Sequence, residues 1–331
     1  MPRKVTMNFD YRFTKRALQK PLHINKHRFE YVETLEVSLF ANTFRGRGEA
    51  CGVFYLGDDK QHMEAQLLSI EKHIAKGLNR SHLQTLLPPG GARNALDCAL
   101  WDLECKSHGE SIWQRLQLPP KQLNTVYTIG ISDANTMASH ARQASRFPQL
   151  KVKLDQDEPI EKLRAIHQAR PDAELILDIN QGWDETQLME YLPQLAPLGV
   201  VLLEQPLARE RDTLLETLNR DIPIAADESC LNLSDYQQVK NRYDVINIKL
   251  DKCGGLSEGL EIARQAKKEG KQLMVGNMIG SSLAMAPAYV IGQFCQFIDL
   301  DGPLLLREDY QDPVDISQDG QCAFPKPSLW G

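Results

Sequence analysis

The spacing of apolar residues changes along the chain near residue 120. Before that point, β-rich stretches such as 31–44 alternate with helical ones such as 92–105, in which apolar residues recur at helical spacing. After residue 125, short apolar runs alternate with amphipathic helical stretches such as 258–268. We therefore expect a mixed α+β domain at 1–120 and a second domain of different architecture at 121–303.

Eight short apolar runs in the second domain are expected to be strands. They cover residues 125–131, 150–154, 174–179, 200–203, 223–226, 245–250, 272–275 and 297–300. Helical stretches, among them 282–292, separate neighbouring runs, and this alternation is typical of a parallel sheet. Eight strands in about 175 residues indicate a closed barrel. An open doubly wound sheet is the alternative, but no GxGxxG motif follows the first run.

Several smaller features complete the expected fold. We interpret Gly46 and Gly48 as turn residues that follow the first β-rich stretch. Asp97 and Asp102 lie in the helical stretch, and we interpret them as solvated or capping groups. The tail from Asp301 to Gly331 holds no clear element. We expect it to pack back on the first domain, with residues 304–331 belonging to that domain.

Polar residues recur at the ends of the expected strands, where a barrel carries its active site. They are Lys151, Lys153, Asp178, Asn180, Glu204, Asp227, Glu228, Lys249, Asp299 and Asp301. From Lys153 to Lys249, one such residue follows each strand, at intervals of 22 to 26 residues. A lone aspartate after a strand is usually a helix N-cap. A series in register on consecutive strands instead indicates a shared site.

Three acidic residues, Asp178, Glu204 and Asp227, follow neighbouring strands and should therefore lie close together. Three carboxylates in one site repel one another and need a cation between them. Oxygen ligands select a hard divalent ion, and Mg²⁺ is the default choice. We predict that these side chains hold Mg²⁺ and leave open positions for a substrate carboxylate.

Lys153 and Lys249 belong to the second and sixth strands, which are opposite each other in an eight-stranded barrel. A lysine base needs a lowered pKa, which Mg²⁺ and the nearby Lys151 ammonium would supply. One lysine would remove the proton next to the substrate carboxylate, and the metal would stabilise the resulting enediolate. The other lysine would return a proton on the opposite face. Two bases on two faces favour an epimerase or a racemase.

The eighth strand presents Asp299 and Asp301 on the far side from the expected metal. They could hold a cationic group of the substrate, and a dipeptide would span the distance between its carboxylate and its ammonium. Alternatively, both residues only stabilise the chain turn at Gly302 and Pro303. The residues themselves leave these two interpretations open.

Composition narrows the class of protein. The chain has 331 residues, of which 42% are hydrophobic, and its formal net charge is −6. The sequence has no block of Lys and Arg residues, which argues against a surface that binds nucleic acid. No apolar run approaches the ~20 residues of a membrane span. The N-terminus lacks the apolar run of a secretory signal. Seven scattered cysteines without a CxxC pair lead us to expect reduced thiols in a cytoplasmic protein.

Several motifs at the strand ends are familiar. They are Lys151-Val152-Lys153, Asp178-Ile179-Asn180, Glu204-Gln205-Pro206, Ala226-Asp227-Glu228-Ser229 and the segment 247–255 (NIKLDKCGG). Together with the helical segment 92–103, they resemble the enolase superfamily and in particular its muconate-lactonizing-enzyme branch. The motif Asp299-Leu300-Asp301-Gly302-Pro303 is similar to that of the dipeptide epimerases, especially the L-Ala-D/L-Glu epimerases, where it holds the α-ammonium of the substrate.

The resemblance spans nearly the whole chain and implies an α/β fold, a (β/α)₇β TIM-like barrel with an α+β N-terminal capping domain. It implies that Lys153 and Lys249 are the acid/base residues, and that Asp178, Glu204 and Asp227 are the Mg²⁺ ligands. Lys151 would help to hold the substrate carboxylate. Thr128, at the end of the first strand, would be a further substrate contact.

Two positions depart from the pattern of the Ala-Glu enzymes. There, an arginine of a capping loop binds the side-chain carboxylate of the glutamate. Ungapped counting places Phe29 at this position, and Arg28 lies next to it, with Lys26 and His27 close by. Asn277 stands where some relatives have a small thiol residue. We include Arg28 and Asn277 among the expected substrate contacts.

The resulting expectation is a Mg²⁺-dependent dipeptide epimerase that acts on L-Ala-D/L-Glu in peptidoglycan peptide metabolism. A homo-oligomer is expected because barrel enzymes of this branch often assemble. The alternatives within the branch are a cycloisomerase, an o-succinylbenzoate synthase or an N-acylamino acid racemase, whose substrates carry no ammonium for Asp299 and Asp301. A non-catalytic binder on the same barrel is disfavoured, since all five metal and lysine positions are intact.

Overall fold

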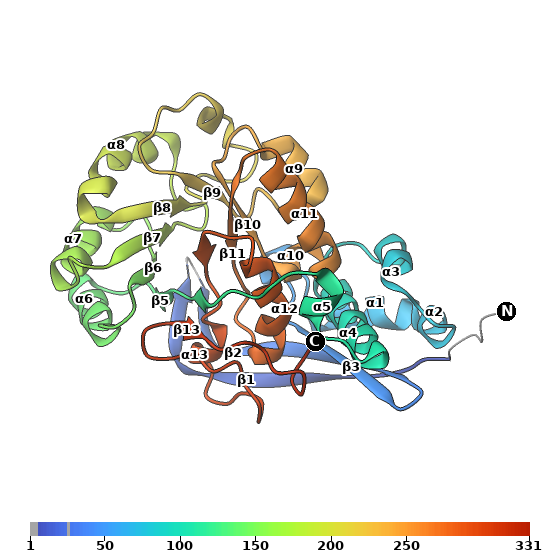
Figure 1. The fold of residues 1–331 in the computed structure, drawn as a ribbon. Coiled ribbons are helices and arrows are strands. Elements are labelled where there is room, and N and C mark those ends of the chain that lie inside the picture. Colours follow the sequence, from blue (N-terminus) through green and yellow to red (C-terminus); the bar gives the residue numbers. More distant parts are fainter. Residues whose placement is uncertain (1–5, 25–26) are drawn as a thin grey trace.

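The N-terminal part is a three-stranded antiparallel sheet with helices packed beside it (Figure 1). The computed structural model describes residues 6–24 and 27–331. The sheet consists of β1 (Asn8–Ile24), β2 (His27–Ala41) and β3 (Phe44–Ala50), and the helices are α1 (Lys60–Ser69), α2 (Glu71–Ala75), α3 (Arg80–Leu86) and α4 (Gly91–His108). Leu35, Val37 and Leu39 alternate along β2 and are buried in one core with residues of α4.

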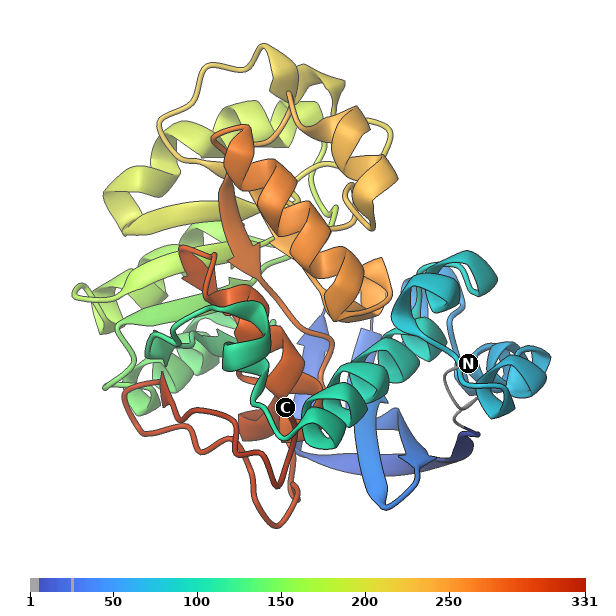
Figure 2. The same ribbon diagram turned by 45° about the vertical axis from the view of Figure 1, so that its right-hand side comes forward.

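Helix α4 lies directly against β3, and two glycines permit this close approach (Figure 2). A Cβ atom on Gly46 would lie 2.2 Å from the carbonyl oxygen of Ala99, and one on Gly48 would lie 2.1 Å from that of Ala95. The interpretation of these glycines as turn residues is therefore wrong. Both lie inside β3, where the helix backbone leaves no room for a side chain.

The second part is a barrel of eight parallel strands that follow the order of the sequence. They are β5 (Tyr127–Ile129), β6 (Gln149–Lys153), β7 (Glu174–Asp178), β8 (Val200–Glu204), β9 (Ile224–Ala226), β10 (Val245–Ile248), β11 (Gln272–Val275) and β12 (Phe297–Ile298). The two ends of the sheet meet where the backbone N–H of Val126 donates to the carbonyl oxygen of Ile298 at 3.0 Å. All eight predicted strands are confirmed, with ends that differ by no more than two residues. The predicted TIM-like barrel with a capping domain is confirmed.

Helices between the strands cover the outside of the barrel (Figure 1). They are α6 (Ala134–Gln143), α7 (Pro159–Ala169), α8 (Glu185–Leu195), α9 (Leu233–Val239), α10 (Leu250–Cys253), α11 (Leu256–Lys268) and α12 (Ser282–Gly292), with 3₁₀ turns η2 (Ala196–Leu198) and η3 (Thr213–Glu216). Helix α11 shows why they pack there: it buries Leu260 and Ala263 near β10 and β11 and exposes Lys267 and Lys268. The remaining link to the first part contains α5 (Ile112–Leu116) and β4 (Leu123–Asn124).

Two acidic residues of α4 are buried, although we interpreted them as solvated or capping groups. The Asp97 carboxylate accepts the backbone N–H of Ser257 at 2.8 Å and its hydroxyl at 2.6 Å, and burial raises the Asp97 pKa to about 6. The Asp102 carboxylate accepts the backbone N–H groups of Arg47 and Gly331, each at 2.8 Å. Both side chains are buried and are therefore not solvated groups. Asp97 bonds the first turn of α11, and Asp102 bonds backbone groups that are far away in the sequence.

The C-terminal tail contacts the N-terminal part. The buried indole of Trp330 donates to the carbonyl oxygen of Cys98 in α4 at 2.9 Å. The tail also contains two short elements that the sequence did not reveal, α13 (Gly302–Leu305) and β13 (Gln321–Cys322), of which β13 pairs with β4. The domain boundary at residue 120 and the assignment of 304–331 to the capping domain stay predictions. Among the described residues, no helix is long and apolar enough to cross a membrane.

Candidate active site

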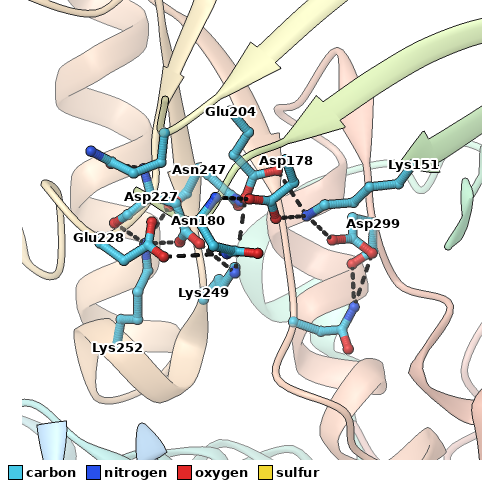
Figure 3. A network of polar contacts seen from close by, with 12 residues as sticks. Lys151, Asp178, Asn180, Glu204, Asp227, Glu228, Asn247, Lys249, Lys252 and Asp299 are labelled. Atoms are coloured by element: carbon cyan, nitrogen blue, oxygen red, sulfur yellow. Dashed lines mark hydrogen bonds and ion pairs between the residues drawn. The ribbon is translucent and has the colours of Figure 1, made fainter. Parts of the chain in front are cut away.

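Three buried carboxylates gather at the carboxyl ends of adjacent barrel strands. Asp178 ends β7 and Glu204 ends β8, and the parallel register pairs these two residues directly. Asp227 follows β9. One oxygen atom from each of the three side chains lies within 4.8 Å of the others. The structure therefore brings together the three residues that the sequence predicted as metal ligands, as Figure 3 shows.

This acidic trio fits a hard divalent cation. All three donors are carboxylate oxygens, which Mg²⁺ prefers, and the side chains are buried. Burial raises the pKa of Glu204 to about 7, and the neighbouring Asp178 charge adds to this shift. An anionic cluster that resists full ionisation in this way is stabilised by a cation. The role of each residue as a ligand stays a prediction.

The two lysines predicted as bases lie on opposite sides of the acidic trio. Lys153 ends β6, and its Nζ atom bonds Asp178 and, at 3.2 Å, the Asn180 side-chain oxygen. Lys249 follows β10, and its Nζ atom lies 2.7 Å from Asp227. Since β6 and β10 are four strands apart in a barrel of eight, these lysines approach from opposite walls. Both line one cavity of about 540 Å³.

Opposite charges in the site hold Asp178, Asp227 and Lys249 in their charged forms. Burial alone would raise the pKa of Asp178 and Asp227, but the lysine ammonium groups outweigh it and lower both values. Burial alone would lower the pKa of Lys249, but the carboxylates, above all Asp227, outweigh it and raise the value. The Lys151 charge acts against protonation of Lys249, but the opposing effect of Asp227 is larger.

Lys151 joins the acidic trio to the acidic residues after the eighth strand (Figure 3). Its buried Nζ atom lies 2.7 Å from Glu204, 3.1 Å from Asp178 and 2.7 Å from Asp299. The side chain of Asn277 donates to the backbone oxygen of Asp299 at 2.7 Å. Lys151, Asn277 and Asp299 thus form one continuous polar network with the trio.

Asp301 is buried beside the first strand. Its carboxylate accepts the backbone N–H of Thr128 at 2.7 Å, and burial together with the Asp299 charge raises its pKa to about 7. Asp301 precedes α13, but its side chain makes no capping hydrogen bond to that helix. The alternative interpretation, in which the acidic pair only stabilises the turn at Gly302, therefore does not account for the contact of Asp301 with Thr128. Thr128, Asp299 and Asp301 all lie at the junction of β5 and β12.

Comparison with known proteins identifies the family. Residues 16–116 match the mandelate racemase/muconate lactonizing enzyme N-terminal domain, and residues 135–327 match the enolase C-terminal domain-like family. The chain belongs to the enolase superfamily. The resemblance inferred from the strand-end motifs is thereby confirmed.

Two relatives and two solved structures place this superfamily member more closely. It is 39% identical to the L-Ala-D/L-Glu epimerase of Escherichia coli, over 91% of this chain and 94% of that one. It is 37% identical to the N-acetyl-D-glutamate racemase of a Pseudoalteromonas species, over 81% and 85%. An Agrobacterium tumefaciens enolase family member with bound sodium and L-Ala-L-Glu is 36% identical, with a TM-score of 0.95 over 98% and 100%. The Methylococcus capsulatus dipeptide epimerase, complexed with Mg and L-Arg-D-Lys, is 30% identical, with a TM-score of 0.91 over 99% of each chain.

Two residues without a predicted role form hydrogen bonds to the acidic trio of this enolase superfamily member. The Asn247 amide donates to Glu204 at 2.8 Å. The Lys252 ammonium donates to Asp227 at 2.6 Å and to three backbone oxygens. Asn247 could have been found, since it lies two residues before Lys249 and shares its face of the strand. Lys252 lies in a helical turn after the strand, where no such rule applies.

Arg28, the predicted contact of the substrate side chain, is not part of the polar network around the acidic trio. Arg28 lies on β2 and lines the outer part of the same cavity, but it forms an ion pair with Glu30, and both side chains are more than half exposed. His27 lines the cavity beside it. Lys26 lies outside the described residues. The prediction that Arg28 binds the substrate side chain stays a prediction.

Proposed function

We propose that this chain is a Mg²⁺-dependent dipeptide epimerase, which inverts the carbon next to the substrate carboxylate by a two-lysine mechanism. The observation that carries the proposal is the position of Lys153 and Lys249, on opposite walls of one cavity with the acidic trio between them. A single base could exchange a proton but could not deliver it to both faces of a carbon. Two opposed lysines can do both.

Asp178, Glu204 and Asp227 would hold the ion. When bound, Mg²⁺ would draw negative charge from the substrate carboxylate and would offset the carboxylates that raise the pKa of Lys249. Lys151 lies 2.7 Å from Glu204 and would hold the substrate carboxylate from the side of the eighth strand.

The proton steps belong to the two lysines. One of them, as the free amine, takes the α-proton from its face of the substrate and becomes an ammonium. The other, as the ammonium, gives a proton to the opposite face of the enediolate and becomes a free amine. One proton leaves the carbon and one arrives, so the product is the stereoisomer, and the reverse reaction exchanges the two roles.

The acidic pair at the junction of β5 and β12 would hold the α-ammonium of the substrate. Asp299 and Asp301 are buried and lie across the barrel mouth from Glu204. A dipeptide has its carboxylate and its ammonium separated by one peptide unit, so it would connect the two sites. The E. coli relative and the L-Ala-L-Glu of the A. tumefaciens structure make L-Ala-L-Glu the first substrate to test. A role in peptidoglycan peptide metabolism in the cytoplasm, as a homo-oligomer, is part of this proposal.

A second candidate is the racemisation of an N-acylated amino acid, which the Pseudoalteromonas relative favours. The same lysines would carry that reaction. An N-acyl group, however, is neutral, and it would leave Asp299 and Asp301 buried without a cation from the substrate. The acidic pair therefore favours the dipeptide.

Deuterium uptake tests the proposal directly. The enzyme with Mg²⁺ in D₂O should incorporate one deuteron at the C-terminal α-carbon of L-Ala-L-Glu and produce L-Ala-D-Glu, as measured by NMR and chiral chromatography. N-acetyl-L-glutamate should react far more slowly. Rapid exchange of the N-acetyl compound without exchange of the dipeptide would favour the second candidate, and no exchange of either would contradict both.

A further inference from the structure

A loop of the N-terminal part reaches over the cavity that holds both lysines. It covers residues 51–59, between β3 and α1, and contains the 3₁₀ turn η1 (Phe54–Leu56). Gly52, Phe54 and Tyr55 line the cavity together with Lys153 and Lys249. The loop therefore forms part of the wall of the cavity in which a substrate would bind.

Hydrogen bonds to the barrel and to α4 fix both ends of this loop. At its start, the Asp251 carboxylate accepts the backbone N–H groups of Cys51 and Gly52, at 2.8 and 3.0 Å. At its end, the Asp58 carboxylate accepts the backbone N–H of Gly91 at 2.7 Å. Gly52 has φ +71°, and a Cβ there would lie 2.1 Å from the backbone oxygen of Asp58. The loop is thus held in a defined shape over the site.

The Tyr55 hydroxyl is a buried donor without a protein partner. Its oxygen has no hydrogen-bond partner among the described residues. A phenol is protonated at neutral pH, so this hydroxyl can donate a hydrogen bond. A buried polar group without a partner is costly, so an acceptor supplied by the substrate would be bound favourably.

The surroundings of Tyr55 show which part of a dipeptide it faces. The cavity that Tyr55 lines is also lined by Asn180 after β7 and by Asp227 and Glu228 after β9, whereas the proposed ammonium site follows β12, three strands away from each in the closed barrel. On its outer side, its ring packs edge-to-face on Phe54 at 5.3 Å, and Phe54 contacts His27 and Phe29 of the hairpin. Tyr55 thus lies away from the ammonium end, beside an aromatic wall that suits the methylene groups of a side chain.

We propose that the Tyr55 hydroxyl donates a hydrogen bond to an acceptor oxygen on the side chain of the C-terminal residue of the substrate. This inference rests on the proposed dipeptide epimerase and gives it a selectivity, for a glutamyl side chain over an apolar one of similar length. Tyr55 would supply a buried donor in addition to Arg28, which lines the same cavity and forms an exposed ion pair with Glu30.

A comparison of two dipeptides in two variants tests the assignment. L-Ala-L-Glu offers a side-chain acceptor, and L-Ala-L-Met has a similar length without a comparable oxygen. Tyr55→Phe should lower kcat/KM for L-Ala-L-Glu by about tenfold to a hundredfold, the usual loss for a hydrogen bond to a charged group, and should change the value for L-Ala-L-Met less than about twofold. Tyr236→Phe is the matched control, because its hydroxyl bonds Glu269 on the outside of the barrel at 2.9 Å.

The outcomes separate this inference from the proposed function. An equal loss for both dipeptides, or no loss for either, would overturn the inference while the epimerase stands. If the wild-type protein exchanges the α-proton of neither dipeptide, the proposed function is wrong, and the inference that rests on it is wrong too. A lower unfolding temperature of Tyr55→Phe than of Tyr236→Phe would call for a second variant. Tyr55→His restores a hydrogen-bond donor on a shorter side chain, and it should recover part of the preference for L-Ala-L-Glu over L-Ala-L-Met. The absence of that recovery would also count against the hydrogen bond.

Discussion

The strand ends of the barrel and the loop at 51–59 contribute to one cavity in different ways. At the strand ends, each polar group occupies the same height of a repeated strand–helix unit, and the register pairs Lys153 with Asp178 and Asp178 with Glu204. The loop has no repeat, and single contacts such as that of Asp251 with Cys51 hold it. We infer that the regular frame of strand ends carries the reacting groups, while the irregular loop at 51–59 determines which substrate binds.

The two regions are nevertheless joined by buried charge. Glu49 of β3 accepts the backbone N–H of Ser281 before α12 at 2.9 Å, and its other oxygen lies 2.9 Å from the Arg16 guanidinium. The Cys51 thiol donates to the backbone oxygen of Ile279 at 2.9 Å. Despite these contacts, the division of roles predicts that changes at the strand ends mainly alter kcat and that changes in the loop mainly alter KM.

Removal of a lysine from the frame should have the largest effect. Lys153→Ala should lower the rate of inversion by about a thousandfold or more, because one face of the carbon loses its acid and base. Lys249→Ala should also abolish inversion but should still exchange the α-proton of one stereoisomer in D₂O, as measured by NMR. Lys268→Ala, on the exposed face of α11, is the control. Full epimerisation by both active-site variants would rule out the two-base scheme.

Loss of one carboxylate from the acidic trio should come next. Asp178→Asn should raise the Mg²⁺ concentration needed for half-maximal activity by about a hundredfold, since a neutral amide binds a hard cation weakly. Calorimetric titration with Mg²⁺ alone gives a readout that does not depend on turnover. Asp244→Asn, which affects an ion pair with Arg220 outside the cavity, should leave Mg²⁺ binding unchanged. Equal Mg²⁺ affinity in both variants would place the ion elsewhere.

The same contrast explains how much could be predicted from the sequence. Lys153, Asp178 and Glu204 could be placed because a parallel register converts spacing along the chain into neighbourhood in space. The contacts of Asp97 with Ser257 and of Asp102 with Gly331 could not be placed, since these partners are more than 150 residues away in the sequence. A local pattern indicates only the ion pair of Asp102 with Lys106, four residues further along the helix.

The glycines of β3 and the hydroxyl of Tyr55 failed as sequence signals for the same reason. Gly46 and Gly48 look like turn residues until α4 lies against them, because a glycine reports only that space or backbone freedom is needed. Tyr55 is one of nine tyrosines, and only the folded loop shows that its hydroxyl is buried over the acidic trio. Side chains on repeated strand–helix units can be placed from the sequence, whereas contacts between distant segments can be found only in the structure.

A change in the acidic pair should affect the dipeptide without affecting the metal. Asp301→Asn should raise KM for L-Ala-L-Glu by about tenfold, because the α-ammonium loses one charged partner, while the amide oxygen can still accept the N–H of Thr128. Steady-state kinetics at several Mg²⁺ concentrations would show whether the Mg²⁺ requirement is unchanged. Equal damage to dipeptide and metal binding would count against an ammonium site at this position.

The smallest expected effect comes from the anchor of the loop. Asp251→Ala removes the acceptor of two backbone N–H groups, so the loop should become less ordered and KM should rise by about threefold to tenfold. The value of kcat should stay within about twofold, since no reacting group moves. Asp251→Asn is the matched control, because both N–H groups bond the same oxygen, which an amide can replace. A fall in kcat as large as the rise in KM would show that the loop also positions the reacting carbon, and the division between frame and loop would then be wrong.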